Sequence, residues 1–214
     1  MTSNQLSSSN EGDCSFSIGY QEHEQQASHK LLQHLETYVC ESEIETASVV
    51  RSKRMIMKHP DIWYQSCEEG HITGSGLIIH KASKEILLMY HRKLQLWLQM
   101  GGHGEGELDP SQIALREAIE ESGLTDLTFF PDSVQPTFID VDAHLIPGRG
   151  DIVEHYHLDF RYLFYTSSPE KIQRAKAEAH DLRWYSFSEI PTLPLRQATL
   201  RLIQKAMSVL NSSQ

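Results

Sequence analysis

Carboxylates gather in one short stretch, GGHGEGELDPSQIALREAIEESGL, which runs from Gly101 to Leu124. Within it, Glu117, Glu120 and Glu121 stand at i, i+3 and i+4, so in a helix they project from neighbouring positions on one face. Like charges this close repel one another unless a cation lies between them. Converging carboxylates are the ligands that Mg²⁺ or Mn²⁺ prefers. The spacing therefore indicates a divalent metal site, against the alternative of a solvated acidic helix face.

The chain carries the signals that a helix needs at this place. Asp109 is a good N-cap, Pro110 suits the first helical position, and Gly123 can end the helix in a left-handed turn. Arg116 lies four residues before Glu120, so the two side chains can pair. We expect this helix to present its acidic face directly after the glycines.

The same stretch resembles the Nudix box, GX5EX7REUXEEXGU, in which U is a bulky aliphatic residue. Leu108 stands where the first box glutamate belongs, with Glu107 one residue early, and Ala118 is smaller than the usual U residue. GHITGSGLIIH, HRKLQLWLQMGGH and EHYHLDFRYLF extend the resemblance, which covers residues 69–190. The remaining box positions match, and they are Gly102, Arg116, Glu117, Glu120, Glu121, Gly123 and Leu124.

The resemblance implies an α/β/α sandwich and the hydrolysis of a nucleoside diphosphate linked to another moiety. Glu117, Glu120 and Glu121 would bind Mg²⁺ or Mn²⁺, together with the main-chain carbonyl of Gly101 or Gly102. Arg116 would orient the carboxylates in this catalytic group. Glu117 is the first candidate to position or deprotonate the attacking water, a task that suits a carboxylate beside a metal.

Many Nudix enzymes bring one further carboxylate from a segment after the box. Glu178, in AKAEAHDLRW, resembles that residue and is a catalytic candidate. The alternative is an ordinary surface glutamate.

Five more residues are candidates for substrate binding. In EHYHLDFRYLF, strand alternation places His155 and His157 on one face with Asp159 and Arg161, where they could contact phosphate or metal or simply form a polar layer. His103, beside the glycines, could touch a phosphate or a metal-bound water. Upstream of the box, Arg92 and Lys93 are candidates for phosphate contact, or are plain surface cations. Nearby Trp97 could stack on a base or lie in the core.

The elements around the box predict an α+β fold with a mixed sheet. Residues 1–25 are polar and are expected to form a mobile tail. Residues 26–68 should form a helical extension, in which Ser42 caps a helix that ends near Lys58 before Pro60. Residues 69–214 are expected to form the Nudix-like domain. Strand-like runs are HITGSGLIIH, EILLMYH, WLQM, LTFFPDS, VQPTFIDVDAHLI, EHYHLDFRYLFYT and DLRWYSF, and a last helix is LRQATLRLIQKAMSVL.

Composition limits the classes of partner. The 214-residue chain has a net charge of -10, which argues against metal-free binding to bare nucleic acid or an anionic membrane. A small nucleotide-type diphosphate fits better than long RNA, although capped or triphosphorylated RNA stays open. The three cysteines form no CxxC, and we expect reduced thiols in a cytoplasmic protein. No signal peptide or membrane span is expected.

Two other functions compete with the hydrolase. A catalytically weak or silent Nudix-fold module that binds a nucleotide could have lost its carboxylates, whereas Glu117, Glu120, Glu121 and Arg116 are all present. An isoprenyl diphosphate isomerase would need a catalytic cysteine segment that SCEEGH does not resemble. Ile139 and Asp140 occupy the positions that mark some substrate subclasses, and neither residue matches those marks. The extension could serve dimerisation under either function.

Overall fold

Two parallel strands form the centre of the fold in the computed structural model, which describes residues 14–132, 135–173 and 181–212. They are β1, Gly70–His80, and β7, His155–Thr166. Their register runs from Gly70 opposite Tyr156 to His80 opposite Thr166, without a break. Because paired residues point to the same face, odd-numbered residues of both strands share one face and even-numbered residues share the other.

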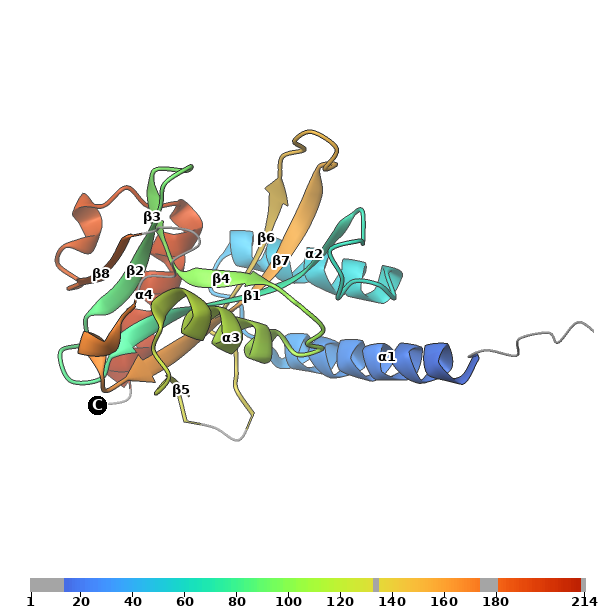
Figure 1. The fold of residues 1–214 in the computed structure, drawn as a ribbon, viewed down its shortest axis with the longest axis horizontal. Helices are drawn as coiled ribbons and strands as arrows, with labels where there is room; N and C mark the ends of the chain where they lie inside the picture. The colour runs from blue at the N-terminus through green and yellow to red at the C-terminus, as the bar shows by residue number, and fades with distance from the viewer. Residues whose placement is uncertain (1–13, 133–134, 174–180, 213–214) are drawn as a thin grey trace, which may run out of the picture.

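The other strands add to this pair in antiparallel fashion (Figure 1). The sheet has the order β3-β2-β1-β7-β5, and β4, β6 and β8 pair with β1, β7 and β2 respectively. The first half of β1 therefore pairs with β4 and its second half with β2. The bounds are β2 Ile86–His91, β3 Leu96–Leu98, β4 Met100–His103, β5 Thr128–Phe129, β6 Asp140–Ile146 and β8 Asp181–Tyr185.

Helices cover both faces of the sheet, so the α+β sandwich predicted from the sequence is confirmed. The even face carries Ile72 and Phe160, which pack with buried residues of three helices: α1, Cys14–Thr37; α2, Glu43–Lys58; and α3, Pro110–Ser122. The odd face carries Leu77 and Leu163, which pack on α4, Gln197–Ser212. Two short 3₁₀ turns, Pro169–Lys171 and Ile190–Thr192, complete the described elements.

Two segments differ from expectation. Helix α1 starts at Cys14, so residues 14–25, expected in a mobile tail, are helical. Their polar composition hid this, and tertiary contacts hold the helix: Tyr64 bonds Glu24, and Trp63 Nε1 donates to Ser28 Oγ over 3.0 Å. The stretch WLQM, expected as one strand, divides between β3 and β4, and the glycines themselves lie in β4.

The odd face of the central pair changes character along its length. β1 begins with polar His71, Thr73 and Ser75 and continues with Leu77 and Ile79. β7 follows the same plan, with histidines and Asp159–Arg161 first and Leu163 afterwards. One half of the face thus packs on α4, and the other half is available to line a site.

The helical extension is anchored to the domain by buried polar contacts. Lys205 of α4 bonds Glu45 of α2, and both side chains are almost completely inaccessible to solvent. Tyr38 Oη donates to the main-chain oxygen of Ile139 over 3.1 Å. Ser42 caps α2 as predicted, because its side chain accepts a bond from the Glu45 N–H. The extension is therefore packed against the sheet and not loosely attached.

Candidate active site at the carboxylate helix

Helix α3 is fixed at both ends by the residues that the sequence indicated. The Asp109 side chain accepts a hydrogen bond from Ser111 N–H over 2.9 Å, and Pro110 opens the helix. Gly123 ends it with φ of 74°, a left-handed conformation that glycine adopts without strain. These caps set where α3 begins and therefore which way its acidic face points.

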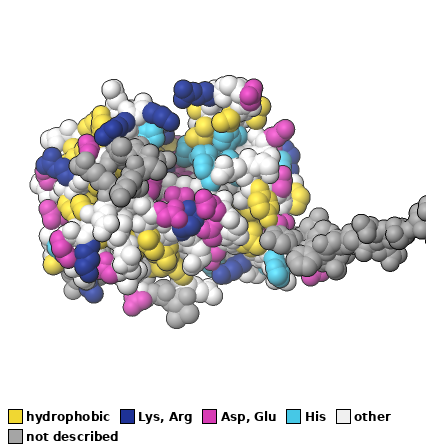
Figure 2. All heavy atoms as spheres, viewed as in Figure 1, with side chains coloured by type: hydrophobic (Ala, Val, Ile, Leu, Met, Phe, Trp, Pro, Cys, Tyr) yellow, Lys and Arg dark blue, Asp and Glu magenta, His cyan; other side chains and the backbone are white. Residues whose placement is uncertain are grey.

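Arg116 is the centre of that acidic face. Its Nε donates to Glu107 Oε1 over 2.6 Å, and its Nη1 lies 3.1 Å from both Glu117 Oε1 and Glu120 Oε2. Its Nη2 donates to the main-chain oxygen of His103 over 2.5 Å. Figure 2 shows acidic side chains gathered around one basic group, with histidines beside them. One guanidinium thus ties three carboxylates to strand β4.

The departure from the box at residue 108 has a structural answer. Leu108 packs against the hydrophobic core next to α3. Glu107 instead supplies a carboxylate to Arg116, and this ion pair depresses the pKa of Glu107 although burial acts in the opposite direction. Arg116 therefore pairs with the carboxylate of Glu107, one residue before the position where the box has its first glutamate.

Strand β4 lies unusually close to α3. A Cβ at Gly102 would come within 2.3 Å of Glu117 Oε1, so a larger residue there would displace the Glu117 carboxylate. The Gly101 N–H donates to Glu121 Oε2 over 2.9 Å. Burial raises the pKa of Glu117, and the neighbouring Arg116 only partly offsets this. The glycines of the box thus let main chain and carboxylates meet.

A cavity of about 310 Å³ opens beside these groups, over the polar half of the odd face. It is large enough for part of a nucleotide-sized ligand. Its walls bring together the box, the histidines and the start of α4, and they include Glu121, Gly102, His103, His157, Asp159 and Arg161.

The other predicted residues lie in different places. His155 touches His157, with 3.3 Å between their Nε2 atoms, and so belongs to the same cluster. Arg92 and Lys93 are exposed in the turn between β2 and β3 and do not line the cavity. Trp97 packs between the rings of Tyr90 and Tyr185. Glu178 lies outside the described residues.

The sequence reading missed part of the polar face. His71 and His144 lie directly opposite His157 on β1 and β6. The alternation of HITGSG places His71 on a polar face, but its neighbour is set by a pairing between strands far apart in the chain. The residues around His71 in the sequence therefore could not predict that it lies opposite His157.

Arg161, which alternation placed beside the histidines, has a different environment from Arg116. It is 2% exposed, and its guanidinium bonds Asp140, Asp142 and Asp159 over 2.8–3.1 Å. Arg201 of α4 bonds Asp140 and Asp142 as well. With the Ala198 main-chain oxygen, these contacts occupy four of the five N–H donors of Arg161, so we interpret it as part of the floor beneath the cavity.

The carboxylates suit a hard divalent cation by their chemistry. Glu117, Glu120 and Glu121 offer oxygen atoms on one helical turn, beside the main chain of Gly102. They are not packed into a tight trio, since Arg116 bonds two of them. Within the described ranges, the trios of ligand atoms lying within 4.8 Å of one another are His71–His103–His157 and His59–Asp61–Cys67.

Comparison with known proteins identifies the family of the chain. A model of the Nudix domain matches residues 70–206, which is more than half of the chain. The chain therefore belongs to the Nudix family, as the box predicted. This membership supports the expected enzyme class, a Nudix-type hydrolase.

The fold is supported by a solved structure with a TM-score above 0.5, the first of three similar structures. A Nudix family hydrolase from Clostridium perfringens is 24% identical, with a TM-score of 0.53 over 65% of this chain and 97% of that one. The Nudix domain of Shewanella oneidensis NrtR, complexed with ADP ribose, is 18% identical, with a TM-score of 0.49 over 65% and 87%. A C. elegans Ap4A hydrolase is 19% identical, with a TM-score of 0.49 over 66% and 98%.

No curated protein matches the chain. None of the helices in the described ranges has the length and apolar character needed to cross a membrane.

Proposed function

We propose that this protein is a divalent-metal-dependent hydrolase that cleaves a pyrophosphate bond in a nucleoside diphosphate linked to another moiety, by attack of water at phosphorus. The observation that carries the proposal is the box itself. Arg116 and the main chain of Gly101–His103 bond Glu117, Glu120 and Glu121, and Glu121 lines the cavity.

Mg²⁺ or Mn²⁺ would be held by these three glutamates and by the carbonyl of Gly101 or Gly102. When bound, it neutralises phosphate charge and lowers the pKa of a coordinated water. Glu117 is the residue we assign to position or deprotonate that water, because it is mostly buried and hydrogen-bonded in one orientation. Arg116 keeps the carboxylates in place.

The histidines of the cavity are the proposed contacts to the phosphates. His103 and His157 line the cavity, and His155 supports them from the start of β7. Arg92, Lys93 and Glu178 stay predictions from the sequence, as do a cytoplasmic location and dimerisation through the extension.

A small nucleotide is the favoured substrate. The net charge of -10 opposes long RNA, and a cavity of about 310 Å³ accepts a compact diphosphate. Capped or triphosphorylated RNA belongs in the test because a metal ion can offset its charge.

The test is release of phosphate or nucleotide from a panel with Mg²⁺ and with Mn²⁺. The panel holds nucleoside triphosphates, ADP-ribose, nucleotide sugars, NADH, diadenosine polyphosphates and 5′-triphosphate RNA. Turnover that disappears with chelator and in Glu121→Gln, but persists in Glu43→Gln, supports the hydrolase. Glu43 is a matched control because it is an exposed carboxylate on α2.

The alternative is a catalytically weak or silent module that binds a nucleotide. The argument for this alternative is that Leu108 replaces the first box glutamate, but the pairing of Glu107 with Arg116 weakens that argument. Folded wild-type protein that binds a panel member and turns over none of them would establish the alternative.

A further inference from the structure

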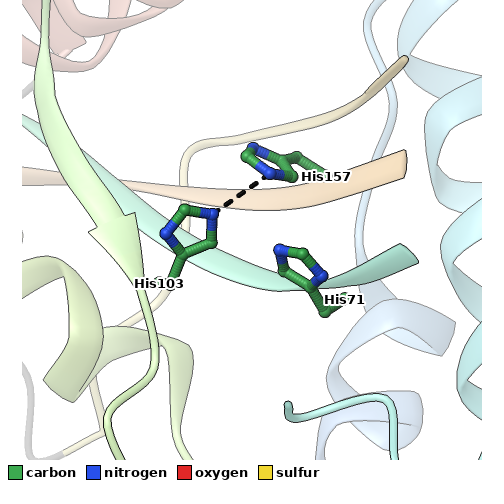
Figure 3. Close-up of side chains that lie close together, drawn as sticks. All are labelled: His71, His103 and His157. Atoms are coloured by element: carbon green, nitrogen blue, oxygen red, sulfur yellow. Dashed lines mark hydrogen bonds between the residues drawn. The ribbon is translucent and has the colours of Figure 1, made fainter. Parts of the chain in front are cut away.

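Five histidines meet at the polar end of the central strands. His71 on β1 lies opposite His157 on β7, which lies opposite His144 on β6. His103 comes in from β4, and His155 is two residues before His157 on the same strand. Figure 3 shows the rings of His71, His103 and His157 turned toward a common space. Four strands thus deliver imidazoles to one point.

The separation of the ring nitrogens suits a shared metal ligand set. The Nε2 atoms of His103 and His157 are 3.1 Å apart. Two nitrogens bound to tetrahedral Zn²⁺ at 2.0–2.1 Å lie about 3.3 Å from each other. The ligand atoms of His71, His103 and His157 all lie within 4.8 Å of one another, so small ring rotations would bring them together.

Proton counting shows that hydrogen bonds alone serve this cluster poorly. His155 Nδ1 lies 2.9 Å from the Val153 main-chain oxygen, which can only accept, so the proton of a neutral His155 is on Nδ1. The Nε2 atom of His155 then carries no proton, and its lone pair is directed at His157 Nε2. One N–H on His157 cannot serve both His155 and His103. At least one lone pair in the cluster therefore lacks a donor.

His71 is the clearest sign that something further binds here. It is 3% exposed, and neither of its nitrogens has a hydrogen-bond partner among the described residues. Such buried orphan groups are rare and call for an explanation. Its ring centroid is 5.0 Å from that of His103 and 4.9 Å from that of His157.

The cluster is suited to ligation at neutral pH. Burial, with the neighbouring His103 and His155 next, lowers the pKa of His71 to about 4. Burial, with His103 next, lowers the pKa of His157 to about 2. Neutral imidazoles carry the lone pairs that metals need.

We propose that His71, His103 and His157 bind one divalent transition-metal ion of the zinc class, at a site separate from the carboxylates of the box. Imidazole favours zinc and its neighbours, whereas carboxylates favour Mg²⁺ and Mn²⁺, so two adjacent sites would select different metals. Three protein ligands leave a fourth position, and His103 and His157 line the cavity, so this position faces bound substrate or water. The phosphate contact proposed for these two histidines would then run through the ion. The inference does not depend on the hydrolase proposal.

The test measures metal binding, not turnover. Full-length protein without a histidine tag is analysed for bound metal, stripped with chelator, and titrated with Co²⁺ while its visible absorption is followed. Zn²⁺ then displaces Co²⁺ to report the zinc affinity. We expect one equivalent per chain, with the intense absorption of tetrahedral cobalt and without a thiolate charge-transfer band.

Variants locate the site. His103→Ala and His157→Ala should each weaken Co²⁺ and Zn²⁺ binding by about 100-fold or more. His103→Gln keeps the side chain's bulk and should weaken it similarly, with circular dichroism confirming the fold. His80→Ala, on the same strand as His71 but half-buried at its other end, is the matched control and should bind normally. Glu120→Gln should bind zinc normally and manganese weakly.

Two outcomes would overturn the proposal. One is a wild type that binds Zn²⁺ no better than His103→Gln and His157→Ala. The other is a single bound ion that is lost in Cys67→Ser, because this result would place it at His59–Asp61–Cys67 instead.

Discussion

Two arginines in this molecule each hold three carboxylates, yet their surroundings differ. Arg161 is buried against Asp140, Asp142 and Asp159, and its side chain is 3% exposed. Arg116, 20% exposed, faces Glu107, Glu117 and Glu120, of which Glu120 is 56% exposed. The same pairing chemistry therefore occurs once in the interior and once at a cavity rim.

The difference lies in the charge that remains after pairing. In the buried cluster, Arg201 and Lys205 join Arg161, so three cations meet the three aspartates and Glu45. At the rim, one arginine meets three glutamates, and Glu121 stands beside them. Near-balance suits a structural interior, whereas surplus negative charge beside a cavity is a place for a cation.

Breaking the buried cluster should have the largest effect on stability. Arg161→Ala would remove the one cation that all three buried aspartates share and would leave Asp159 without its arginine, so we expect the free energy of unfolding to fall by about 3–5 kcal/mol. Urea denaturation measures it. Arg183→Ala removes an exposed arginine that pairs with Glu189 at 3.5 Å, and should change it by less than about 0.5 kcal/mol. Equal losses in the two variants would refute the structural role of Arg161.

The second largest loss of stability should come from breaking the Glu45–Lys205 ion pair, which anchors the helical extension. Lys205→Met leaves the buried Glu45 carboxylate without a cation, although Tyr38 Oη and the Glu41 N–H still donate to it, and we expect a loss of about 3 kcal/mol. Adding Glu45→Gln should recover part of it, because coupled neighbours show interaction energies of about 0.5–3 kcal/mol. A strictly additive double variant would contradict the coupling.

At the rim, the arginine should matter for turnover and not for stability. In Arg116→Ala we expect turnover of the panel substrate to fall about 100-fold, because misplaced catalytic groups cost that much. Unfolding should change by less than about 1 kcal/mol, since the pairs are partly exposed. Arg116→Lys, which keeps the charge without the planar fork, should recover little activity. A severe loss of stability with normal turnover would reverse the comparison.

A smaller effect should follow from Glu107. Glu107→Gln weakens a charge-assisted bond worth roughly 1.5 kcal/mol or more, so we expect about a 10-fold fall in turnover. Leu108→Glu restores the box residue but places a carboxylate against the core, and should lower stability without raising turnover. Faster turnover in Leu108→Glu would show that Glu107 does not fill that role.

The smallest effect should come from a third cluster, at the surface. Hydrogen bonds from Lys58 and His59 lower the pKa of Glu69 from 4.5 to about 2. Because the folded pKa is the lower one, this stabilisation is present above pH 4.5 and is lost as the pH falls toward 2. Exposure limits it to less than about 1 kcal/mol. The gap in urea stability between wild type and Glu69→Gln should therefore be smaller at pH 3 than at pH 7.

Local sequence signals correctly predicted the features that depend on residues close together in the chain, such as helix ends and strand alternation. Ser42, Asp109 and Gly123 marked helix ends correctly, and the alternation of β7 placed its histidines and Asp159 on one face. The parallel pairing of β1 with β7 joins residues 86 apart, so no local pattern could bring His71 to His157. The substitute role of Glu107 likewise depends on how Leu108 turns into the core.

The pair Glu45–Lys205 joins residues that are 160 positions apart in the chain. During synthesis, α2 leaves the ribosome long before α4. Glu45 therefore cannot pair with Lys205 until α4 has been synthesised. Cutting the chain at the bounds of the family match, residues 70–206, would keep Lys205 and discard its carboxylate. We therefore expect residues before Gly70 to contribute to the stability of the Nudix domain, and the N-terminal helices to complete their docking last.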